Sequence, residues 1–150
     1  IVRQVHENFM DAGCDLITAN TFSTTRHNMN SINRGDKTKE FIVRSVEIAK
    51  KAIKNKRKEN IVGIAGSMSN FFSLKENEFV PDLKYLPSFR EEERNYKEAA
   101  KILKEEGVDV LILEMILDID HSKILLNSAL ETGLPVWVGL NRHWYFLDRV

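Results

Sequence analysis

Short apolar runs alternate with helical patterns along the whole chain, and this order leaves few folds open to it. The predicted strands span residues 16–21, 61–65, 108–113 and 135–140, and an amphipathic pattern precedes each of them. Strands that are separated by helices pair in parallel through right-handed crossovers. We therefore expect a parallel α/β fold. A closed barrel is favoured over an open sheet, although the periodicity is compatible with both.

The junctions between helices and strands repeat a short motif. Gly13-Cys14-Asp15-Leu16-Ile17 resembles Gly107-Val108-Asp109-Val110-Leu111. In both segments a glycine can end the helix in the left-handed conformation, and an aspartate precedes the apolar run. Ser88 and Glu91 form a Ser-x-x-Glu capping box that predicts the start of the third long helix. These signals indicate that one supersecondary unit is used more than once.

The composition argues against several classes of protein. The 150 residues carry 22 basic and 22 acidic side chains, a balance that does not favour nucleic acid or an anionic membrane as a partner. No apolar run approaches the roughly 20 residues that cross a bilayer, and no secretory signal pattern is present. The single cysteine, Cys14, fits a reducing compartment, so we expect a cytoplasmic protein. Because Ile1 already lies inside a helical pattern, we expect the chain to be part of a longer protein.

Polar residues at the ends of the predicted strands form the candidate site. In parallel β/α proteins, binding and catalytic groups gather at the C-terminal ends of the strands, where the following loops converge. At these ends the chain has Asn20 and Thr21, Gly66 and Ser67, Glu114, and Asn141. Neither a Gly-x-Gly-x-x-Gly motif nor a Walker loop is present, which weakens the case for a bound nucleotide.

Each of these side chains has a structural interpretation beside the functional one. Glu114 follows an apolar run, so its carboxylate is partly desolvated and needs a partner. That partner is either a substrate ammonium, a basic side chain of the protein, or a cap on the following loop. Asn20 and Thr21 either bind a small polar ligand or satisfy backbone groups where the strand ends. Ser67 follows a glycine that either lets a ligand approach the backbone or belongs to a turn.

Histidines and the cysteine are the remaining candidates for a metal site. The spacing of His6, His27, His121, His143 and Cys14 fits no zinc-binding pattern. Cys14 is expected to be a small buried residue. No serine nucleophile motif of the Gly-x-Ser-x-Gly type is present.

Four segments together resemble the homocysteine S-methyltransferase family. Residues 12–22, 64–68, 107–114 and 133–139 resemble its second, third, fourth and fifth barrel strands, in the same order and with similar spacing. The resemblance implies a (β/α)8 TIM barrel. Residues 1–150 would supply about half of it, a partial homocysteine-binding domain that lacks the first strand and the C-terminal strands.

The resemblance also implies a reaction and its participants. Family members transfer a methyl group from a small donor to the sulfur of homocysteine, which zinc holds as a thiolate, and methionine is the product. The zinc ligands are cysteines beyond the fifth strand, so none is expected in this chain and the segment alone is expected to be inactive. Glu114 matches a glutamate that contacts the substrate amino group. Thr21 matches a threonine near the substrate with Asn20 beside it, and Ser67 matches by position.

One segment departs from the family pattern, and two alternative functions remain open. Met68-Ser69-Asn70 stands where the family often has Gly-Pro, on the side of the methyl donor. Another β/α-barrel enzyme, of the aldolase or isomerase type, would need a strand-end lysine or a glycine-rich phosphate loop. A degenerate barrel that serves as a binding module would lack the zinc cysteines.

Overall fold

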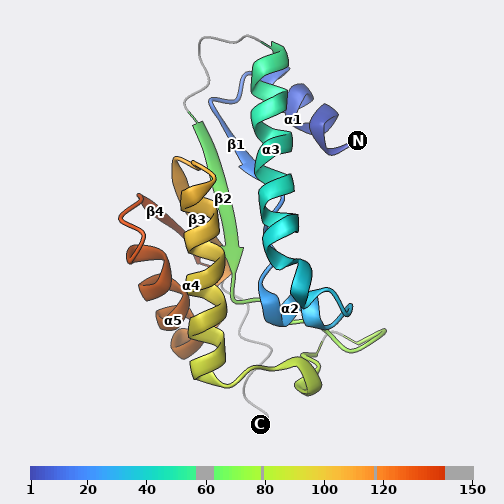
Figure 1. Cartoon of the computed structure of the whole chain (residues 1–150), viewed down its shortest axis with the longest axis vertical. Helices are drawn as coiled ribbons and strands as arrows, with labels where there is room; N and C mark the ends of the chain where they lie inside the picture. The colour runs from blue at the N-terminus through green and yellow to red at the C-terminus, as the bar shows by residue number, and fades with distance from the viewer. Residues whose placement is uncertain (57–62, 79, 117, 141–150) are drawn as a thin grey trace.

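The computed structural model describes residues 1–56, 63–78, 80–116 and 118–140. In this part of the chain, four strands form one parallel sheet in sequence order, and the arrowheads of β1 and β2 point the same way in Figure 1. The strands are β1 (Leu16–Ala19), β2 (Gly63–Ser69), β3 (Val110–Ile116) and β4 (Val136–Leu140). The predicted parallel α/β order is therefore confirmed.

Helices alternate with these strands as the periodicity predicted. They are α1 (Val2–Asp11), α2 (Arg26–Asn30), α3 (Thr38–Lys56), α4 (Phe89–Glu105) and α5 (Ile119–Leu130), with short 3-10 turns η1 (Gly35–Lys37) and η2 (Leu83–Tyr85). Helices α3 and α4 lie in front of the sheet in Figure 1, and α5 packs beside α4. Within the described residues, no helix combines the length and apolarity that crossing a membrane requires.

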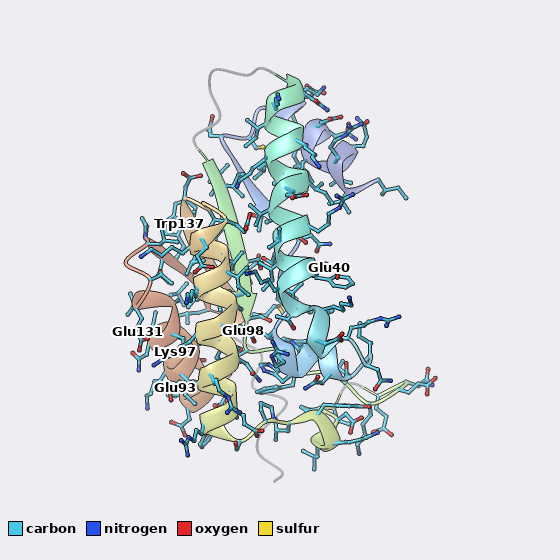
Figure 2. All side chains as sticks on the ribbon, viewed as in Figure 1. Glu40, Glu93, Lys97, Glu98, Glu131 and Trp137 are labelled. Atoms are coloured by element: carbon cyan, nitrogen blue, oxygen red, sulfur yellow. The ribbon has the colours of Figure 1, made fainter. Side chains whose placement is uncertain are left out.

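The two faces of the sheet differ in their side chains. Residues that are paired in a parallel ladder point to the same face, and successive residues of a strand point to opposite faces. On the helix side lie the core residues Ile17, Ala19, Ile64, Met68, Leu111 and Leu113. On the other face lie Thr18, Ala65, Ser67, Val110, Ile112, Glu114 and Trp137. Trp137 of β4, which is 56% exposed and is labelled in Figure 2, lies on this second face, here called the open face.

Apolar stripes on the helices fill the space between them and the sheet. The amphipathic pattern predicted before the second strand is borne out in α3, where Ile42, Val46 and Ala49 are fully buried and Ile53 is half-buried. In α4, Tyr96 and Leu103 are fully buried as well. Burying one such aliphatic side chain contributes about 1.5–3 kcal/mol, so this layer is the main source of stability.

Local signals at the element ends also hold. Ser88 and Glu91 form the predicted capping box, in which each side chain meets the backbone N–H of the other residue. Gly13 and Gly107 follow α1 and α4 with φ angles of +100° and +72°, where a side chain would be strained. The aspartate of the second junction, Asp109, accepts a hydrogen bond from the backbone N–H of Ile64 at 2.7 Å. At this junction the glycine therefore ends α4, and the aspartate links the start of β3 to β2.

Three strand ends differ from the prediction. The first strand, predicted over residues 16–21, already ends at Ala19. The runs predicted to end at Ala65 and Leu113 continue to Ser69 and Ile116, so Ser67 and Glu114 lie within strands and not after them. The reason is nonlocal: β1 and β3 on either side pair with β2 as far as Gly66 and Ser69 respectively, so the polar residues remain in the ladder. Asn141, predicted to end the last strand, lies outside the described residues.

Candidate functional site

A serine and a glutamate on neighbouring strands form the centre of the site. Register pairing places Ser69 of β2 opposite Glu114 of β3, and both Ser67 and Glu114 point to the open face. The Ser67 hydroxyl donates a hydrogen bond to Oε2 of Glu114. Ser67 is buried and Glu114 is half-buried. The carboxylate is thus anchored through one oxygen near the C-terminal edge of the sheet.

Thr21 contacts the backbone of Ser67 through its side chain. Its hydroxyl donates to the carbonyl oxygen of Ser67 at 2.7 Å and accepts from the backbone N–H of Ser67 at 3.0 Å. The backbone pairing of β1 and β2 runs to Ala19 and Gly66, so the Thr21 side chain continues it beyond the end of β1. Thr21 is only 2% exposed, its hydroxyl is engaged with Ser67, and it does not line the pocket described next.

A pocket of about 590 Å³ opens beside these residues. Asn20, Phe22, Ser67 and Glu114 line it at the C-terminal edge of the sheet, and residues of β1 and α1 line the remainder. The Asn20 side chain is exposed, while its backbone carbonyl accepts from Ser45 at 3.0 Å. The structure therefore brings three predicted residues, Asn20, Ser67 and Glu114, to one pocket.

The loops that follow β1 and β2 are joined at the same edge. The rings of Phe22 and Phe71 lie 6.0 Å apart between centroids. Asn28 donates to the carbonyl oxygen of Phe71 at 2.9 Å, and Ser69 donates to that of Phe22 at 3.1 Å. Sequence reasoning did not single out Asn28 or Phe71. The signal that could have found Phe71 is the long connection between β2 and α4, since connections of such length are often functional.

A buried polar cluster, unnoticed in the sequence, lies among the helices. Nδ1 of His121 on α5 is 2.6 Å from Oε2 of Glu92 on α4, and Glu92 is fully buried. His27 on α2 contacts Thr25 at 3.1 Å and Asn95 at 3.3 Å through its two ring nitrogens. None of these residues lines the pocket.

The two histidines of this cluster are shifted in opposite directions. Burial, followed by the charge of His121, lowers the pKa of His27 to about 4. Burial also acts to lower the pKa of His121, but the hydrogen bond and charge of Glu92, together with Asp118 and Asp120, raise it overall. The ring of Phe72 lies 5.6 Å from that of His27 and 5.0 Å from that of His121, so the segment after β2 packs against both.

The described residues do not provide a metal site. No three His, Cys, Asp or Glu side chains in the described ranges are grouped so that they could hold an ion. His6 and Cys14 both line the pocket, and Cys14 is half-buried and not buried as expected. This pair is too small a ligand set for the zinc that the resemblance implies.

Comparison with known proteins places this geometry in a family. The model of the family described as homocysteine S-methyltransferase matches residues 1–143. The fold is similar to that of the Escherichia coli homocysteine methyltransferase MmuM. Its metallated form has a TM-score of 0.70 at 18% identity, and its oxidized form 0.71 at 20%; each match covers 93% of this chain and 50% of that one.

The apo form of the same E. coli enzyme gives a TM-score of 0.65 at 18% identity over 99% of this chain and 49% of that one. The chain thus spans about half the length of these solved structures, and its four parallel strands correspond to half of a homocysteine methyltransferase barrel, as expected. Since the family model extends over almost all of the sequence, the chain belongs to the homocysteine S-methyltransferase family.

Proposed function

We propose that the intact protein transfers a methyl group from a small donor to the sulfur of homocysteine and so produces methionine. Family membership supports the reaction class. The observation that carries the assignment to this chain is the half-buried carboxylate of Glu114, which Ser67 anchors at the edge of a pocket. Homocysteine carries an ammonium group, and a partly desolvated carboxylate is a strong acceptor for it.

Each residue of the site then has a separate task. Glu114 binds the substrate ammonium through Oε1, because Oε2 accepts from Ser67. Ser67 orients the carboxylate, and Thr21 orients Ser67 through the two backbone hydrogen bonds. Asn20, exposed at the rim, is suited to hydrogen-bond the polar atoms of the amino acid. Together they fix one end of the substrate so that the sulfur can be presented to the methyl donor.

Zinc dependence belongs to the proposal and rests on the resemblance. A bound zinc ion keeps a thiol deprotonated at neutral pH, which makes the sulfur nucleophilic. Its ligands would be cysteines outside residues 1–150, so the segment alone is proposed to be inactive. We further propose homocysteine and a small methyl donor as the partners, neither nucleic acid nor a membrane, and a cytoplasmic location, which the neutral charge and single cysteine support.

Methylation of homocysteine by the intact protein tests this proposal. Replacing Glu114 by Gln removes a charge-assisted hydrogen bond, typically about 1.5–3 kcal/mol, so kcat/KM should fall about 10- to 100-fold. The matched control is Glu131→Gln, because Glu131, directly after α5, pairs with Lys97 of α4 on the helix side (Figure 2). Equal activity of both variants would refute the role of Glu114, and activity that survives complete metal removal would refute the zinc requirement.

A further inference from the structure

The strand that carries Glu114 contains a bulge immediately after it. On the β4 side, Leu113 pairs with Val138 and the next pair is Ile116 with Leu140. Strand β3 therefore advances by three residues where β4 advances by two, so Glu114 and Met115 together face Gly139. On the β2 side the pairing is regular as far as Ser69 and Glu114. The irregularity thus affects only the side away from Ser67.

This bulge changes which face the strand buries. Residues three apart in a regular strand point to opposite faces. Leu113 and Ile116 are three apart, yet both belong to the core on the helix side, where they are 1% and 8% exposed. The extra residue lets both anchor in that core while Glu114, between them, stays on the open face. Without the bulge, Ile116 would point to the open face together with Glu114, because residues two apart in a regular strand share a face.

Met115 has the backbone conformation that makes the bulge possible. Its φ angle is +54°, a left-handed value that is uncommon for residues other than glycine and asparagine. Such a conformation persists only where the surroundings impose it, and bulges of this kind often re-aim a side chain next to an active site. Here the buried Ile116 on one side and the Ser69–Glu114 pairing on the other impose it.

We propose that Met115 is a positioning residue for the homocysteine site, and that its left-handed backbone, not its side chain, holds the Glu114 carboxylate against Ser67. The identity of the ligand rests on the proposed function, whereas the geometric role does not. Residues that tolerate the left-handed region should preserve the site, and a β-branched residue should disturb it.

Four substitutions in the intact protein separate backbone from side chain. Met115→Gly and Met115→Asn favour the left-handed conformation, Met115→Val opposes it, and Met115→Leu keeps the volume of the side chain. The Kd for L-homocysteine, measured by calorimetry, should stay within about twofold for Gly and Asn and rise about tenfold for Val. In a Glu114→Gln background the Val substitution should add less than twofold, because the carboxylate that it misplaces is already gone.

The Kd values of the Val, Gly and Asn variants decide the role of Met115. A Kd for Val equal to that of the unchanged protein would overturn it, as would Gly and Asn weakening binding while Leu does not. If the Val variant does not fold, Gly and Asn against Leu still decide between backbone and side chain. If the unchanged protein binds no homocysteine, the proposed function fails. Crystal structures of the Gly and Leu variants then test the Ser67–Glu114 hydrogen bond directly: its loss in Gly would refute the role of Met115, and its retention there would support it.

Discussion

Glu114 and Glu92 are two carboxylates that each accept a hydrogen bond from one side chain, yet their surroundings differ. Glu92 is fully buried between helices, 2.6 Å from the His121 ring, and it does not line the pocket beside β1. Glu114 is half-buried, receives its hydrogen bond from a neutral serine, and lines a pocket of about 590 Å³. The first joins α4 to α5, and the second has an oxygen available to a ligand.

The difference shows that burial alone does not mark a binding carboxylate. A fully enclosed charge needs a protein partner, because desolvation costs more than any transient contact returns. A half-enclosed charge with a neutral anchor keeps part of its electrostatic field for a bound cation. Variants at Glu92, His27, His121 and Thr21 test whether these roles are separate.

The largest expected effect is on stability, at Glu92. Replacing Glu92 by Ala leaves the His121 ring without its partner in a buried setting, which typically costs about 3–5 kcal/mol. Chemical denaturation of the intact protein measures this loss. The neighbouring Glu93→Ala is the control, since Glu93 forms only an exposed ion pair with Lys97 and should change stability by less than about 0.5 kcal/mol. Similar losses in both variants would end the distinction between Glu92 and a surface carboxylate.

The next effect is the acid sensitivity of the helix cluster. The folded pKa of His27 is about 4, below the unfolded value of 6.5, so the unfolded state binds its proton first. Stability is therefore lost as pH falls from 6.5 toward 4, by about 3 kcal/mol at pH 4. The free energy of unfolding, measured at pH 7 and pH 4, should show this loss in the unchanged protein. In His27→Asn most of the loss should disappear.

His121 provides a check of sign for the same measurement. Its folded pKa is raised, so its contribution is present below pH 6.5 and is lost as pH rises through the folded value. His121→Asn should therefore flatten the alkaline side of the stability profile and leave the acid loss in place. An acid loss that persists in His27→Asn and disappears in His121→Asn would reverse our assignment.

A smaller effect is expected at Thr21, whose hydroxyl bonds the backbone of Ser67 beside the pocket. Thr21→Val keeps the shape of the side chain but leaves the buried N–H and carbonyl of Ser67 without this partner, a loss of about 1–3 kcal/mol. We expect a lower melting temperature and a KM for homocysteine raised a few-fold through Ser67. Ser23→Ala, at an exposed position of the following loop that does not line this pocket, is the control and should change neither. A Thr21 variant that matches it would show that the hydroxyl does not support the site.

Much of the fold could be read from local patterns. The α3 stripe, the Ser88–Glu91 box and the two glycine junctions depend on residues within about one helical turn of each other, and all are confirmed. Glu114 could also be found, because a carboxylate that follows an apolar run is rare without a partner. Glu92 could not, since it stands among other acidic residues and its burial depends on His121, 29 positions away.

By itself, therefore, the sequence determined the order of helices and strands, where most helices begin and end, and which residues are candidates for the site. Only the tertiary structure decided how far β2 and β3 extend, that the Thr21 hydroxyl bonds the backbone of Ser67, and that a bulge follows Glu114 at Met115. The physical reason is the distance along the sequence over which each interaction acts. Caps and periodicity act over a few residues, whereas the contacts of Ser67 with Thr21 and Glu114 join residues 46 and 47 positions apart. Such contacts exist only once the strands have paired.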